Sequence, residues 1–119
     1  MKKIFHLSTC NTCQRILGEW KPPAAFELQN IKEKNISAAE LDFAAKQLGS
    51  YEALFSRRAL KYKSMGLANK KLTEKDYRKL ILEEYTFLKR PVLINSQEVF
   101  AGNPKNTVMA AKKSIHSKK

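Results

Sequence analysis

Apolar residues along the first part of the chain follow spacings that predict a strand, a helix and a second strand. Residues 2–7 are short and β-favouring, which predicts a first strand. Apolar residues at helical spacing over residues 11–20 predict a helix, which Pro22 and Pro23 prevent from continuing. Apolar and polar residues then alternate over residues 25–31, as in a strand. A helical crossover of this length implies that the two strands run parallel.

The middle of the chain is predicted to be mainly helical. Residues 37–40, Ser-Ala-Ala-Glu, form a capping box before an apolar stripe, which predicts a helix over residues 37–48 that Gly49 ends. Residues 50–72 contain enough apolar residues for one or two helical turns and are otherwise interpreted as a basic connector. A further helix is predicted to begin at Thr73. Its inner face is expected to carry Tyr77, Leu80, Ile81 and Tyr85.

The last part of the chain predicts a hairpin followed by a helix. Residues 91–94 and 98–101 read as antiparallel strands joined through residues 95–97. Asn103 is expected to cap a final helix with Pro104 at its first position, before a lysine tail that frays. The order β–α–β, helices, β–β–α predicts the α/β class, with a mixed four-stranded sheet of the thioredoxin kind flanked by helices.

Composition restricts the class of protein further. The chain has 119 residues, with 23 Lys and Arg against 11 Asp and Glu, a net charge of +12, which fits one small domain. Hydrophobic residues make up 43%, which excludes disorder as the main interpretation. No segment approaches the roughly 20 apolar residues of a membrane span, and the N-terminal apolar stretch is too short for a signal core. Two cysteines are too few for a secreted disulfide framework, so a cytoplasmic setting is expected.

The two cysteines, Cys10 and Cys13, lie where the first strand passes into the first helix. A helix N-terminus presents unpaired backbone N–H groups and positive dipole charge, which stabilise a thiolate. Cys10 at the helix entry is therefore the candidate nucleophile. Cys13 lies one turn further on the same side and is the candidate resolving thiol.

Two other interpretations of the cysteines stay open. Cysteine is among the most buried residue types, so Cys13 could be part of a core with Ile16. A zinc site would need two further ligands, and the candidates His6 and His116 lack the spacing of a zinc finger.

Positive charge is concentrated between Arg57 and Lys75, where seven cations accompany one acid, Glu74. Such a segment attracts anions, although individual lysines there can equally form a solvated surface. Arginine binds oxyanions through paired hydrogen bonds, and Arg58 and Arg90 are the candidates, with Arg57 and Arg15 in reserve.

Arg90 is followed by Pro91 at the start of a predicted strand. Pro91 either starts this strand or forms a cis bond that turns the backbone toward a neighbouring loop.

These stretches together resemble the ArsC-like arsenate reductases and their relatives, including the transcriptional regulator Spx, over essentially the whole chain. The resemblance lies in residues 7–13, in residues 54–58 with 65–67, and most specifically in residues 87–94. It implies a single thioredoxin-fold domain over residues 1–119 with a helical insertion at about residues 35–86.

The resemblance also implies roles for individual residues. Cys10 takes the place of the catalytic cysteine, Arg58 and Arg90 those of anion-binding arginines, and Pro91 that of an active-site cis-proline. Cys13 stands where glutaredoxin-coupled reductases generally have serine, and the resulting Cys-x-x-Cys pair is instead similar to that of Spx. Gln14 stands where Spx has arginine.

The implied function is that of a thiol-dependent oxidoreductase, with arsenate reduction as the leading activity. Its substrate would be a small oxyanion or a thiol, with glutathione as a co-substrate, glutaredoxin as a partner, and no bound cofactor or metal. The alternative is a Spx-like redox-sensing regulator that binds RNA polymerase without catalysis. Direct DNA binding is a third hypothesis, but the sequence lacks a recognisable DNA-binding motif, so specific binding is not expected.

Overall fold

A computed structural model describes residues 1–117, which fall into two compact units. The first unit contains residues 1–34 together with the chain from Arg90 onward, and the second unit contains Asn35–Lys89. The helical section predicted at about residues 35–86 falls within the second unit. That the whole chain forms a single domain stays a prediction, and the predicted fraying concerns Lys118 and Lys119, outside the described residues.

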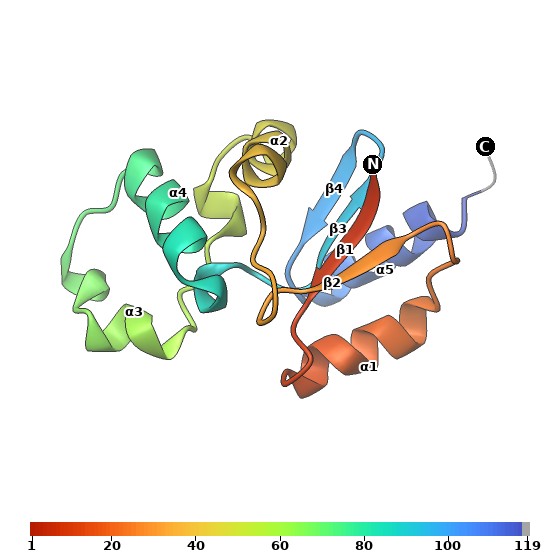
Figure 1. The fold of residues 1–119 in the computed structure, drawn as a ribbon, viewed down its shortest axis with the longest axis horizontal. Coiled ribbons are helices and arrows are strands. Elements are labelled where there is room, and N and C mark those ends of the chain that lie inside the picture. The colour runs from red at the N-terminus through yellow and green to blue at the C-terminus, as the bar shows by residue number, and fades with distance from the viewer. Residues whose placement is uncertain (118–119) are drawn as a thin grey trace. The chain divides into compact units, whose positions relative to one another are not determined.

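The first unit is built on a four-stranded mixed sheet in the order β2-β1-β3-β4 (Figure 1). The central strand β1 pairs with β2 in parallel and with β3 antiparallel, and β3 and β4 form an antiparallel hairpin. The mixed α/β sheet predicted from the sequence is therefore confirmed. The strands are β1 (Lys2–His6), β2 (Glu27–Asn30), β3 (Val92–Asn95) and β4 (Glu98–Ala101).

Two helices, α1 (Asn11–Trp20) and α5 (Lys105–Ile115), pack side by side against the sheet. The core between them and the strands is apolar, because each helix turns one buried stripe toward the sheet. Trp20 is fully buried there, and its indole N–H donates a hydrogen bond of 3.0 Å to the carbonyl of Val108. The core cluster comprises Ile4, Ile16, Trp20, Phe26, Leu93, Val108, Ala111 and Ile115.

The second strand is shorter than the predicted range of residues 25–31. Phe26 donates its backbone N–H to the carbonyl of Pro23 at 3.0 Å, which closes a turn before the strand begins. This turn removes the first two residues from the predicted strand. The chain turns again after Asn30, so that the strand comprises Glu27–Asn30.

The boundaries of the hairpin and the last helix also differ from the prediction. Asn95 pairs with Glu98 inside the ladder, so only residues 96 and 97 form the connection, and Ser96 takes a φ of 57°. Pro104 has an extended ψ of 141° and is itself the cap residue of α5, which places Asn103 outside the helix. The predicted cap at Asn103 and first helical position at Pro104 are wrong by one residue.

Side-chain capping fixes the two longer helices of the second unit. Ser37 and Glu40 form the predicted capping box of α2 (Ala38–Leu48), and Gly49 ends this helix with a φ of 97°. Thr73 accepts from the backbone of Asp76 in the same way at the start of α4 (Glu74–Glu83). Both predicted helices are confirmed, with the cap residue just before the first helical residue.

A helical turn is present at residues 52–54, as the sequence allowed. The interpretation of the rest of residues 50–72 as a basic connector is wrong, because further short helices form there, around a buried aromatic side chain. Phe55 is fully buried and lies 4.8 Å from Tyr77 and 5.1 Å from Phe87, measured between ring centroids. These tertiary contacts, rather than a helical repeat, order the segment. The short elements are η1 (Glu52–Leu54), α3 (Leu60–Ser64) and η2 (Leu67–Asn69).

The predicted inner face of α4 is wrong for two of its four residues, Leu80 and Tyr85. Tyr77 and Ile81 are buried, whereas Leu80 is partly exposed. Tyr85 lies beyond the end of α4, in the short turn η3 (Tyr85–Phe87), and is also partly exposed.

None of the helices described within residues 1–117 is long and apolar enough to cross a membrane.

The capping box of α2 predicts a measurable contribution to stability. We expect Ser37→Ala to lower the free energy of unfolding by about 1 kcal/mol, because the backbone N–H of Glu40 loses its acceptor. Denaturant unfolding followed by circular dichroism measures this change. Ser37→Asn keeps an acceptor at the cap and is expected to retain most of the stability, so an equal loss in both variants would contradict the role of the cap.

Candidate functional site around Cys10

Pairing of the strands brings the cysteine segment and the Arg90–Pro91 step to one end of the sheet. Strand β1 ends at His6, and the chain continues through a turn into α1, where Cys10 is the cap residue. Phe5, near the end of β1, pairs with Val92 at the start of β3. Residues 90 and 91 therefore precede β3 at the same end of the sheet, and the peptide bond between them is cis.

The cysteine turn is closed by backbone hydrogen bonds on both sides of Cys10. The N–H of Cys10 donates to the carbonyl of Leu7 at 3.0 Å, and the carbonyl of Cys10 accepts from the N–H of Gln14 at 3.0 Å. Cys10 has an extended backbone, is partly buried, and makes no capping hydrogen bond with its side chain. The thiol thus lies at the N-terminus of α1, where the helix dipole favours negative charge.

Asn30 anchors the same turn to the end of β2. Its side-chain amide donates to the hydroxyl of Ser8 at 2.9 Å, and its side-chain oxygen accepts from the backbone N–H of Ser8 at 3.3 Å. Sequence reasoning did not identify this residue as part of the site. Its position at the end of a strand parallel to β1 was the available signal, since parallel strands end at the same edge of a sheet.

Cys13 lies on the first turn of α1 and is fully buried. Burial raises the pKa of its thiol, and the nearby thiol of Cys10 acts in the same direction. A hydrogen bond with the backbone of Leu7 and the charge of Arg90 oppose this increase in pKa. Cys13 therefore lies within electrostatic reach of both Cys10 and Arg90, while its burial also agrees with a place in the core. Its role as resolving thiol stays a prediction.

The candidate arginines lie in different units of the chain. Arg90 belongs to the first unit with both cysteines and is partly buried. Arg58 belongs to the second unit, where it is exposed in the turn before α3, and its anion-binding role stays a prediction. The reserves are engaged locally: Arg57 binds Glu52 and the hydroxyl of Tyr77, and Arg15 binds Glu19.

Within residues 1–117, no three His, Cys, Asp or Glu side chains lie close enough together to hold a metal ion. The two histidines weighed as zinc ligands make other contacts. His6 contacts the side chain of Gln14 at 3.3 Å, and the Nε2 of His116 lies 2.6 Å from the carbonyl oxygen of Trp20. His116 thus helps to join the ends of α5 and α1 instead of lying in a tail.

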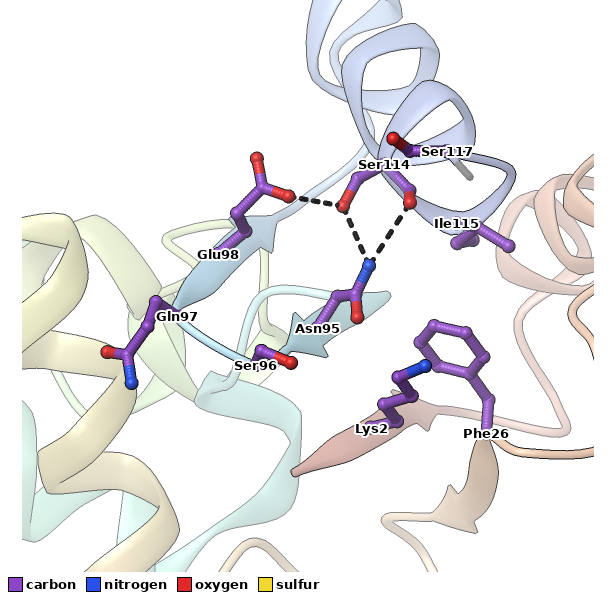
Figure 2. A pocket seen from close by; sticks show the side chains of 9 residues that line it. All are labelled: Lys2, Phe26, Asn95, Ser96, Gln97, Glu98, Ser114, Ile115 and Ser117. Atoms are coloured by element: carbon purple, nitrogen blue, oxygen red, sulfur yellow. Dashed lines mark hydrogen bonds between the residues drawn. The ribbon is translucent and has the colours of Figure 1, made fainter. Parts of the chain in front are cut away.

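A polar cavity of about 420 Å³ lies at the other end of β1, around Lys2 and the hairpin (Figure 2). Figure 2 shows that Ser114 links α5 to the hairpin, because its hydroxyl donates to Glu98 at 2.8 Å and accepts from Asn95 at 3.0 Å. Lys2 pairs with Asn95 in the sheet, far along β1 from the cysteine turn. None of the predicted site residues lines this cavity.

The model of the ArsC family matches residues 5–111, which include the cysteine turn, the second unit and the Arg90–Pro91 step. The chain belongs to the ArsC family. No curated protein matches the chain.

Solved structures with the same fold include proteins related to the ArsC family. An arsenate reductase from Vibrio cholerae is 22% identical with a TM-score of 0.72, and the match covers 92% of this chain and 96% of that one. A protein from Bacteroides fragilis described as related to the ArsC family is 21% identical with a TM-score of 0.77, over 92% and 96% of the two chains. An arsenate reductase related protein from Brucella melitensis is 20% identical with a TM-score of 0.65, over 92% of each chain. These similarities establish the thioredoxin-like fold of the ArsC family.

The different burial of the two thiols predicts different reactivity. We expect iodoacetamide to modify Cys10 before Cys13 at neutral pH. The buried Cys13 thiol has a raised pKa and therefore stays protonated to a higher pH than an ordinary thiol. Mass spectrometry of the partly alkylated protein identifies the modified residue. In Cys10→Ser, alkylation should become slow and increase only at alkaline pH. Fast neutral alkylation of Cys13 in this variant would contradict the expectation.

Proposed function

We propose that the protein is a thiol-dependent oxidoreductase of the ArsC family that reduces arsenate with Cys10 as its nucleophile. The observation that carries this proposal is the placement of a partly exposed cysteine at the N-terminus of α1, at the same end of the sheet as Arg90 and beside a second thiol. Membership of the ArsC family supports it independently.

Electrostatics favours an oxyanion as the substrate of such a site. A thiolate and an oxyanion repel each other, so their reaction needs positive charge that stabilises both. The N-terminus of α1 supplies backbone N–H groups, and the Arg90 guanidinium supplies a full charge in the same unit. We propose that Arg58 is a further anion-binding arginine and that Pro91 shapes the loop facing Cys10.

The reaction proceeds by exchange at sulfur and arsenic. The Cys10 thiolate attacks arsenate, an As–S bond forms, and one arsenic-bound oxygen leaves as water after taking up protons. A second thiolate then attacks the sulfur of Cys10, and the electron pair of the As–S bond passes to arsenic, which gives arsenite and a disulfide. Cys13 is the proposed attacking thiol within the chain, after it loses its proton. Glutathione is the proposed co-substrate and glutaredoxin the partner that return the disulfide to thiols, in the cytoplasm and without a bound cofactor.

A Spx-like regulator is the second candidate, and the pair of cysteines favours it. Cys13 stands where glutaredoxin-coupled reductases generally have serine, and both thiols lie on one helix turn. In this alternative, oxidation of Cys10 and Cys13 changes the surface around α1 and thereby the binding of RNA polymerase, and no substrate is turned over.

Arsenate turnover with glutathione and glutaredoxin tests the enzymatic proposal. We expect Cys10→Ser to abolish turnover, because it removes the nucleophile, and Cys13→Ser to retain part of it, because glutathione can attack the intermediate directly. No turnover in the unaltered protein, together with binding of RNA polymerase only after oxidation, would contradict the enzyme and favour the regulator.

Protection of Cys10 by arsenate tests the anion site. Arsenate is expected to slow alkylation of Cys10, and Arg90→Ala should weaken this protection about tenfold or more, because a charge-assisted hydrogen bond is lost. Arg15→Ala is the matched control in the same unit, since Arg15 is exposed and paired with Glu19. Equal protection in Arg90→Ala and the unaltered protein would remove Arg90 from the anion site.

A further inference from the structure

The exposed side chain of Gln14 makes two hydrogen bonds to residues that lead into the cysteine turn. Its Nε2 lies 3.0 Å from the carbonyl oxygen of Leu7 and 3.3 Å from the Nδ1 of His6. A carbonyl oxygen only accepts, so the atom beside it must be the amide nitrogen, whose second hydrogen then points to the imidazole. The Nδ1 of His6 is therefore an unprotonated acceptor, and the proton of the neutral ring is on Nε2.

Leu7 is the residue through which these bonds reach both thiols. Its carbonyl accepts from the N–H of Cys10 as well as from Gln14, and its backbone is hydrogen-bonded to Cys13. Gln14 also donates its own backbone N–H to the carbonyl of Cys10 at 3.0 Å. Gln14 thus holds Cys10 in two ways. Its backbone bonds to Cys10 directly, and its side chain bonds to the Leu7 carbonyl, which in turn accepts from Cys10.

We propose that Gln14 is a positioning residue, which keeps Cys10 at the N-terminus of α1 by holding the Leu7 carbonyl, and that neutral His6 keeps the Gln14 amide in the orientation this requires. The use that Cys10 makes of this position rests on the proposed function. The positioning itself applies equally to a nucleophile and to a redox-sensing thiol.

Protonation of His6 would reverse the orientation of the Gln14 amide. A protonated Nδ1 no longer accepts from the amide nitrogen and donates instead to an amide oxygen. When the Gln14 amide turns to present its oxygen to Nδ1, the Leu7 carbonyl loses its second donor. Burial lowers the pKa of His6 and so keeps the ring neutral to lower pH, whereas the carboxylate of Glu33 acts in the opposite direction. Asn30 of β2, which pairs with His6, is uncharged, as is Gln14 of α1, whose first turn also carries the titratable thiols.

The experiment compares the pH profile of Cys10 alkylation in the unaltered protein, in Gln14→Met and in His6→Asn. Methionine has the length of glutamine but no donor, so alkylation of Gln14→Met should slow about fivefold near neutral pH, with a profile displaced to higher pH. Asparagine offers an acceptor that cannot be protonated, so His6→Asn should be alkylated at the same rate as the unaltered protein near neutral pH. At acid pH, its alkylation rate should fall less than that of the unaltered protein, because the contribution of His6 protonation is removed. Gln47→Met on the exposed face of α2 is the matched control.

A second measurement follows Gln14 in the unaltered protein, with His6→Asn as the comparison. The side-chain amide resonances of Gln14 in the unaltered protein should shift with the protonation of His6, and should not shift over this pH range in His6→Asn. An alkylation profile unchanged in Gln14→Met, or Gln14 resonances independent of His6, would overturn the positioning role. The two proposals can fail separately. If the protein does not turn over arsenate but its alkylation profile depends on Gln14, the enzymatic proposal is contradicted and the positioning role of Gln14 is kept.

Discussion

The pairing of β1 with both of its neighbours is the constraint on which the cysteine site depends. Parallel pairing with β2 puts the ends of both strands at one edge, and the N–H of Ile31 extends this pairing by donating to the carbonyl of His6 at 2.8 Å. Antiparallel pairing with β3 brings the start of that strand, preceded by Arg90 and Pro91, to the same edge. A register shift of one residue would turn Ile4 and Leu93 away from the core, so the core and the site are specified together.

The two thiols occupy different environments although only two residues separate them. Cys10 is the cap residue of the helix and is partly exposed to solvent, whereas Cys13 is buried and its thiol has a raised pKa. This asymmetry suits a pair in which one sulfur meets an external reactant and the other acts only after the first has reacted. The charge of Arg90 and the hydrogen bond with Leu7 lower the cost of ionising the buried thiol, and both come from segments that the sheet holds in place.

The sequence predicts most of the fold because its local signals agree with its tertiary structure. The capping boxes at Ser37 and Thr73 identify α2 and α4, since a cap acts within four residues. Of the short helices around Phe55, the sequence indicates no more than one or two turns, because packing against Tyr77 and Phe87, which are distant in sequence, orders the segment. In the site, the strand–cysteine–helix order is visible in the sequence. The supporting amides of Gln14 and Asn30 are not, because a side chain bonded to the loop backbone leaves no periodic signal.

Trp20, at the end of α1 and bonded to α5, allows the two units to be followed separately by spectroscopy. Trp20 is the one tryptophan of the sequence and lies in the first unit, whereas the four tyrosines, Tyr51, Tyr62, Tyr77 and Tyr85, all lie in the second. Indole emission excited at the red edge of its absorption therefore reports on the cysteine-bearing unit alone. Phenol absorbance reports on the inserted helices, so the chain carries a separate natural chromophore for each of its two units.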